Sequence, residues 1–173
     1  MKLFFSLVLA VILNLSLAYA QLFRTGLSAG ISTAQYDGDN YSGYNKLGLC
    51  AGGFLNTKLN EKWTFQFEII YVQKGAIRNP NPAKNYFNQY ALKLNYMEVP
   101  LLFQYSHKKV VFESGIGMGA LIKEKEEVQY ADITGVRPFN KTELSFNAGL
   151  NYMINDDLVI NWRYTHSILP VRP

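Results

Sequence analysis

The sequence predicts an all-β fold: an antiparallel, up-and-down transmembrane β-barrel of the eight-stranded type, with seven strands visible and the last one missing. Three observations predict it. Apolar residues alternate with small and polar residues at period two. The connections between these segments are alternately long and short, as in membrane barrels. The chain is 14% aromatic and only 17% charged, yet its mean hydropathy of −0.05 is too low for a bundle of membrane helices. Strands with one apolar and one polar face satisfy all three.

The first twenty residues have the organisation of a secretory signal peptide. Lys2 precedes a short apolar run, and the segment ends in Ala18-Tyr19-Ala20, which resembles an A-x-A cleavage signal. The run is shorter than the roughly twenty residues that a membrane-spanning helix needs. We therefore expect residues 1–20 to be a cleaved signal peptide and residues 21–173 to form the barrel domain.

The first three predicted strands cover residues 26–33, 47–59 and 63–74. In the first, Leu27, Ala29 and Ile31 face one way and glycine and serine residues face the other. The second alternates loosely, and the third most clearly. Its odd positions from 63 to 71 are apolar: Trp63, Phe65, Phe67, Ile69 and Tyr71. Its even positions begin with polar residues and then change to Ile70 and Val72. Period-two alternation of this kind is typical of a strand between two different environments.

The fourth predicted strand covers residues 92–105 and is less regular. Met97, Val99, Leu101, Phe103 and Tyr105 share one face, whereas Leu92 and Leu94 fall out of that phase. This change of phase predicts a β-bulge near Asn95. Pro100 removes a hydrogen-bond donor from the strand, which predicts a bulge or a kink on the lumen side.

Three further strands are predicted over residues 110–123, 142–153 and 158–165. Each sets large apolar residues on one face against glycine, serine, asparagine and charged residues on the other. The charged run Lys123–Glu127 is expected to be a solvated strand end that rises into its loop.

The connection lengths support a membrane barrel over a soluble sandwich. Long connections cover residues 36–45, 75–90 and 124–141, and short ones cover 60–61, 106–109 and 154–157. Membrane barrels have short periplasmic turns and longer external loops. A soluble sandwich has no reason to keep this alternation.

We expect the apolar face to meet lipid and the polar face to line the lumen. Aromatic side chains lie toward the ends of several apolar faces, where an aromatic girdle forms in such barrels. The girdle candidates are Trp63, Tyr71, Phe103, Tyr105, Tyr152, Trp162 and Tyr164. The alternative is a soluble, lipocalin-like barrel that carries an apolar ligand, with the apolar face inside.

The polar face carries Glu68, Glu98, Glu113 and Arg163 beside many small residues. A narrow barrel is filled by its own side chains, and a buried carboxylate needs a cation or hydrogen-bond donors. Arg163 offers a planar, permanently charged group that suits carboxylates. We therefore predict that these four residues form a salt-bridged network that fills the lumen around Arg163.

Several motifs resemble a known family. Residues 67–71 (FEIIY), followed by Gln73-Lys74-Gly75, resemble the "ELLYSQKG" stretch of the PorT-like outer-membrane β-barrel family. Residues 94–102 (LNYMEVPLL) resemble its "LxYLEIPLLLKY" motif, and Arg163-Tyr164 occupies the place of an "RY" pair. The resemblance covers residues 24–167. It implies an eight-stranded barrel in the outer membrane of a Gram-negative bacterium, with Glu68, Glu98 and Arg163 in the lumen, but no specific role.

The sequence departs from this family at residues 169–173, because no eighth strand follows the seventh. A seven-stranded sheet would leave two unpaired edges in hydrocarbon, which is costly. We expect either a truncated gene product or closure by a partner strand.

The remaining features favour a non-catalytic role as a scaffold, an adhesion surface or an accessory to secretion. His107 is expected in a basic turn and His166 near a strand end, and neither forms an evident catalytic triad. Cys50 is the only cysteine, so no internal disulfide can form. We expect no enzyme activity, metal, cofactor or nucleic acid. The expected partners are outer-membrane lipid, the barrel-assembly machinery and other envelope or secretion proteins.

Overall fold

The computed structural model describes residues 23–35, 46–78, 80, 89–129, 131–136 and 138–172. The predicted signal peptide lies outside these residues. The strands are β1 (Phe23–Ala34), β2 (Lys46–Lys58), β3 (Trp63–Arg78), β4 (Tyr90–His107), β5 (Val110–Val128), β6 (Ala131–Asp132), β7 (Thr142–Met153) and β8 (Val159–Ser167). Each of the seven predicted strands is present. No described helix is long and apolar enough to cross a membrane.

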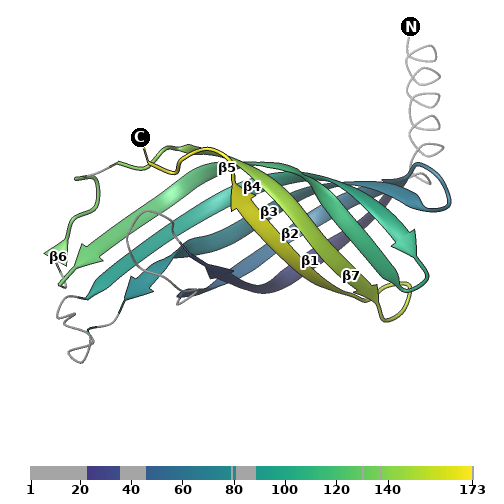
Figure 1. Ribbon diagram of the computed structural model, residues 1–173, viewed down its shortest axis with the longest axis horizontal. Helices are drawn as coiled ribbons and strands as arrows, with labels where there is room; N and C mark the ends of the chain where they lie inside the picture. Colours follow the sequence, from purple (N-terminus) through teal and green to yellow (C-terminus); the bar gives the residue numbers. More distant parts are fainter. Residues whose placement is uncertain are drawn as a thin grey trace, which may run out of the picture.

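The strands form one antiparallel sheet that curls into an open barrel (Figure 1). Its order is β1-β2-β3-β4-β5-β7-β8, and the short β6 pairs only with β5. Apart from β6, neighbours in the sheet are therefore neighbours in the chain. β3, β4 and β5 run further than predicted because residues 74–78 pair with 90–94 and residues 90–95 pair with 123–128. These pairs shorten two of the expected long connections.

The prediction that the apolar face points outward is confirmed. Leu27 is 90% exposed, Ile31 74% and Trp162 69%, whereas the buried polar residues include Glu68, Glu113 and Asn147. The alternative with an apolar ligand inside the barrel is wrong, because the inner face between β3 and β8 is mostly polar. An exposed apolar belt of this kind is stable only in contact with lipid or another apolar surface.

A β-bulge lies where the sequence predicts one, but on the neighbouring strand. Asn95 pairs with Lys123 while Tyr96 pairs with Leu121, so Ile122 of β5 is the extra residue. β4 itself stays in phase, and Leu92, Leu94 and Tyr96 point inward with Glu98. The prediction assumed that apolar residues belong outside. The β4–β5 register continues past Pro100 without a shift. In the β3–β4 ladder, however, Val99 and Pro100 have no paired residue.

The inward apolar residues of β4 form a small core at the long-loop end of the lumen. Leu92, Leu94, Tyr96 and Phe139 are buried together, and Val171 packs against them. The segment after β8 is held there because the backbone N–H of Asn140 donates to the oxygen of Val171 at 2.9 Å. Arg172 forms an ion pair of 2.6 Å with Glu126. Glu126 is buried, so the prediction of a solvated strand end is wrong at this residue.

Gly75 permits the close approach of β3 and β4. Its φ is +140°, and a Cβ would lie 2.1 Å from the carbonyl oxygen of Leu92. We expect Gly75→Ala to lower the free energy of unfolding in detergent by roughly 2–4 kcal/mol, through backbone strain and steric overlap. Denaturant titration followed by circular dichroism measures this change.

Gly135→Ala is the matched control, because Gly135 also has a positive φ, +85°, but nothing within 4 Å of a new Cβ. It should show only the strain component. Equal losses in the two variants would contradict the steric explanation.

Candidate functional site: the charged lumen

The strand register brings the polar side chains of five strands into the lumen. Even-numbered residues of β3 and β4 point inward, as do odd-numbered residues of β5 before the bulge and of β7 and β8. Because all neighbouring strands are antiparallel, these side chains meet across the curled sheet. They form two networks of charged residues.

The first network surrounds Arg163 of β8. Its Nη1 and Nη2 atoms donate to the two carboxylate oxygens of Glu68 at 2.6 and 2.8 Å. Its Nε atom donates to Glu113 Oε1 at 2.7 Å. The guanidinium therefore binds one carboxylate through two parallel hydrogen bonds and a second through its remaining edge, which is the geometry that favours arginine over lysine. This contact joins β8 to β3 and β5 across the lumen.

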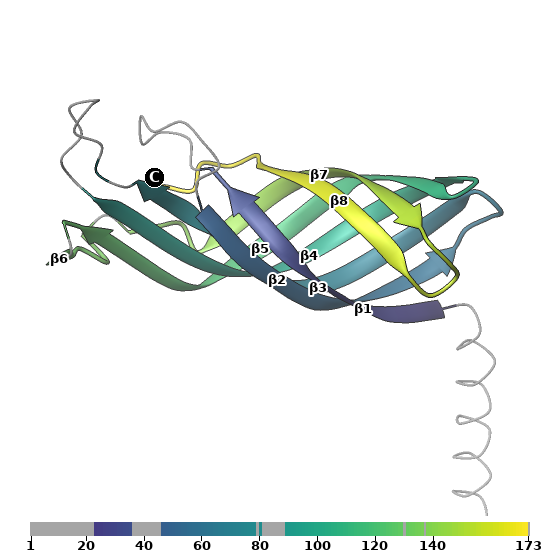
Figure 2. The ribbon, with the colours of Figure 1, turned by 90° about the horizontal axis from the view of Figure 1, so that it is seen from below.

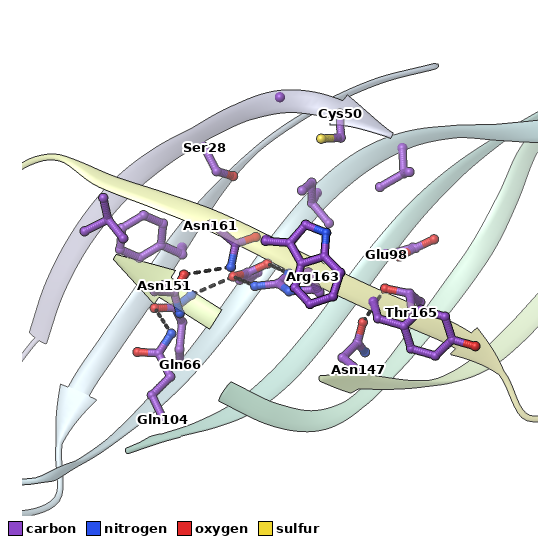
Figure 3. A pocket seen from close by; sticks show the side chains of 18 of the residues that line it. Ser28, Cys50, Gln66, Glu98, Gln104, Asn147, Asn151, Asn161, Arg163 and Thr165 are labelled. Atoms are coloured by element: carbon purple, nitrogen blue, oxygen red, sulfur yellow. Dashed lines mark hydrogen bonds and ion pairs between the residues drawn. The ribbon is translucent and has the colours of Figure 1, made fainter. Parts of the chain in front are cut away.

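Amide side chains complete the Arg163 network. Asn151 and Gln104 donate to Glu113 Oε2 at 2.7 and 3.2 Å, and Asn161 donates to Glu113 Oε1 at 2.9 Å. Gln66 donates to Glu68 Oε1 at 2.6 Å. All four carboxylate oxygens of Glu68 and Glu113 thus accept hydrogen bonds. Figure 3 shows Asn161 and Arg163 close to Asn151, with Ser28 and Cys50 on the opposite wall.

The second network surrounds Lys74 of β3. Its Nζ atom lies 2.6 Å from Glu98 Oε1 and 2.8 Å from Glu143 Oε1. Ser167 donates a short hydrogen bond to Glu143. The sequence predicts Glu98 in the network around Arg163, whereas in the structure Glu98 pairs with Lys74. The prediction missed Lys74 and Glu143, although both lie on polar faces of alternating strands.

Glycines make room for the carboxylates. A Cβ on Gly149 would lie 2.7 Å from Glu113 Oε1, and one on Gly119 would lie 3.3 Å from the Glu98 side chain. The small residues of the polar faces thus fit the charged ones, as close packing of a narrow lumen requires.

The chemistry of these networks is that of structural ion pairs. Both carboxylates of the Arg163 network accept hydrogen bonds from several donors, including the guanidinium. His107 is exposed at the end of β4, and His166 stacks on Tyr164 with 6.3 Å between ring centroids. Among the described residues, no group of three His, Cys, Asp or Glu side chains is arranged to hold a metal ion.

The predicted girdle residues all lie on outward positions. Trp63 and Tyr105 are in contact at the turn end of β3 and β4, with ring centroids 5.1 Å apart. Phe103, Tyr152, Trp162 and Tyr164 are exposed, and Tyr71 is partly buried. Their contact with the membrane interface stays a prediction.

A cleft of about 2350 Å³ lies between the two edge strands. β1 and β8, purple and yellow in Figure 2, line it together with Cys50, Lys74 and Glu98. In the described chain, β1 pairs only with β2 and β8 only with β7. The lumen is therefore accessible along one side of the barrel.

Comparison with known proteins identifies a family. A family described as "Outer membrane protein beta-barrel domain" matches residues 19–171. No curated protein and no solved structure matches the chain significantly.

Proposed function

Because the chain belongs to the outer membrane protein beta-barrel domain family, which places it in the bacterial outer membrane, we propose that it is a non-catalytic barrel with a side-chain-filled lumen. Its role is that of a scaffold, an adhesion surface or an accessory to secretion. The observation that carries the proposal is the bidentate pairing of Arg163 with Glu68 across the lumen. Such a contact fixes strands and occupies the space that a solute would need.

The motifs around Lys74, Glu98 and Arg163 support placement in the PorT-like subgroup. The expected partners are the surrounding lipid, the machinery that assembles such barrels, and other envelope or secretion proteins. With the turns in the periplasm, the loops after β1, β3 and β5 would face the exterior and carry any specificity.

Closure by an eighth strand is part of this proposal. β1 and β8 are the first and seventh strands of an alternating antiparallel series, so they run in the same direction. One further strand, antiparallel to both, would pair with both edges. Such a strand would remove the unpaired backbone groups that hydrocarbon cannot satisfy.

Planar-bilayer recording tests whether the lumen is filled. We expect no steady open channel from the wild-type protein, because an eight-stranded barrel is just wide enough for its own side chains. A variant with Glu68→Ala, Glu113→Ala and Arg163→Ala should conduct, since it removes the groups that fill the middle of the tube. Steady large currents from the wild type would contradict the proposal. A conducting triple variant also shows that the protein inserts under the same conditions.

A further inference from the structure

Four lysines lie close together at the long-loop end of the barrel; Lys93, Lys123 and Lys125 face outward, whereas Lys46 is buried. Lys46, Lys93, Lys123 and Lys125, here called the lysine patch, line a pocket of about 470 Å³ together with Leu47, Gln73, Ile77 and Asn95. They come from β2, β4 and β5, and the pocket is separate from the lumen cleft. Neither charged network of the lumen contributes to it.

The bulge at Ile122 creates this patch. Before the bulge, the odd-numbered residues Glu113, Gly117 and Gly119 of β5 point into the lumen. After it, the phase is reversed, so Lys123 is exposed and Glu126 is buried. A bulge commonly re-aims side chains in this way. If the ladder continued regularly through Ile122 with no bulge, Lys123 and Lys125 would point inward and Glu124 and Glu126 would face outward.

Along β4 and β5, the lysine patch begins where the apolar belt ends. One cross-strand row holds Tyr71, Met97 and Ala120, and two residues further along the strands the next outward row holds Gln73, Asn95 and Lys123. The following row places Lys93 directly opposite Lys125. In a membrane, this level is where acyl chains give way to headgroups, and it is where lysine side chains reach water and anions.

The positive charge of the patch is only partly compensated by the protein. Lys125 pairs with Glu127 at 2.6 Å, and Lys46 donates to the backbone oxygen of Lys74 at 2.6 Å. Within the described residues, no ion pair involves Lys93 or Lys123. Like charges directly opposite each other destabilise a strand pair. An anion bound between the lysines would therefore stabilise this part of the sheet.

We propose that the lysine patch binds the phosphate group of a lipid headgroup in the leaflet that surrounds the long-loop end of the barrel. Lysine ammonium groups bind phosphate as point charges, and basic pockets on membrane proteins bind anionic headgroups in this way. The neighbouring apolar belt, with Met97 and Ile122 exposed, would contact the acyl chains of the same lipid. A membrane lipid meets both surfaces at once, whereas a free phosphate ion would meet only the lysines.

Native mass spectrometry of the protein released from phosphatidylcholine nanodiscs with a minor share of phosphatidic acid tests this proposal. We expect the wild type to retain phosphatidic acid but not diacylglycerol with the same chains. The variant Lys93→Gln/Lys123→Gln/Lys125→Gln should lose affinity by about fivefold per lysine removed. The variant Lys62→Gln/Lys108→Gln/Lys109→Gln changes the net charge equally at the turn end and should retain the lipid.

Three outcomes would overturn the proposal. Equal retention of diacylglycerol would show that acyl chains alone bind. Loss of phosphatidic acid from both triple variants would show a non-specific charge effect. Displacement by millimolar inorganic phosphate would show a site for a free anion. Heat-modifiable gel mobility confirms that each variant is folded. Should the triple variant fail this check, Lys93→Gln and Lys93→Arg are compared instead, with affinity expected to fall about fivefold in the former and to be kept in the latter.

Discussion

Arg163→Met is expected to lower the free energy of unfolding of the barrel by about 3–5 kcal/mol, because it leaves two buried carboxylates without their cation. The Arg163 side chain is 15% exposed, and those of Glu68 and Glu113 are 5% and 0% exposed, so water can compensate little. Three hydrogen bonds from the guanidinium are lost together. The change is measured by denaturant titration in detergent, with folded and unfolded forms separated by gel mobility.

A charge-balanced variant separates this cause from simple loss of packing. Arg163→Met/Glu68→Gln/Glu113→Gln removes the cation and both anions while keeping similar volumes, and should recover most of the lost stability. Arg24→Met, at an exposed position of β1, is the control and should have little effect. A triple variant as unstable as Arg163→Met alone would mean that the stability depends on shape and not on charge.

Ile116→Lys is expected to cost roughly 2–4 kcal/mol in a bilayer, the cost of a lysine near the midplane of a barrel. Ile116 is 52% exposed in the middle of the outward face of β5, between Ser114 and Met118. The ammonium group would have to leave water for hydrocarbon. Reversible unfolding from lipid vesicles, followed by tryptophan fluorescence, measures the difference.

Val136→Lys is the matched substitution, because Val136 is 73% exposed but lies in the connection between β6 and β7. It should be nearly neutral. On a soluble protein, both lysines would simply face water and both changes would be small. A negligible effect of Ile116→Lys in vesicles would therefore contradict the contact between this face and lipid.

Strand positions and the direction of the two faces could be predicted from the sequence because both follow from local alternation. Residues 63–68 show this best, since apolar and polar side chains alternate there at every position. The pairing of Glu68 with Arg163 could also be predicted from the sequence, because both residues lie on polar faces that carry few cations.

Side-chain partners and strand phase were harder to predict. The sequence places Glu98 on the correct face, but only the register shows that Lys74 and not Arg163 lies beside it. The bulge was assigned to Asn95 because Leu92 and Leu94 broke an expected pattern, whereas they fill the end of the lumen with Phe139. Local alternation cannot distinguish an apolar residue that packs inside a barrel from one that has changed phase.

The order of the sheet also bears on how the protein assembles. Consecutive strands can pair as hairpins soon after each is available, since the strands of each ladder are neighbours in the chain and loop-closure cost grows only slowly with loop length. The contact of Arg163 with Glu68, however, joins residues 95 positions apart, so it must await the arrival of β8. Until then the carboxylates of Glu68 and Glu113 would remain hydrated on an open sheet. Their dehydration would coincide with the pairing of β8, the last step of folding.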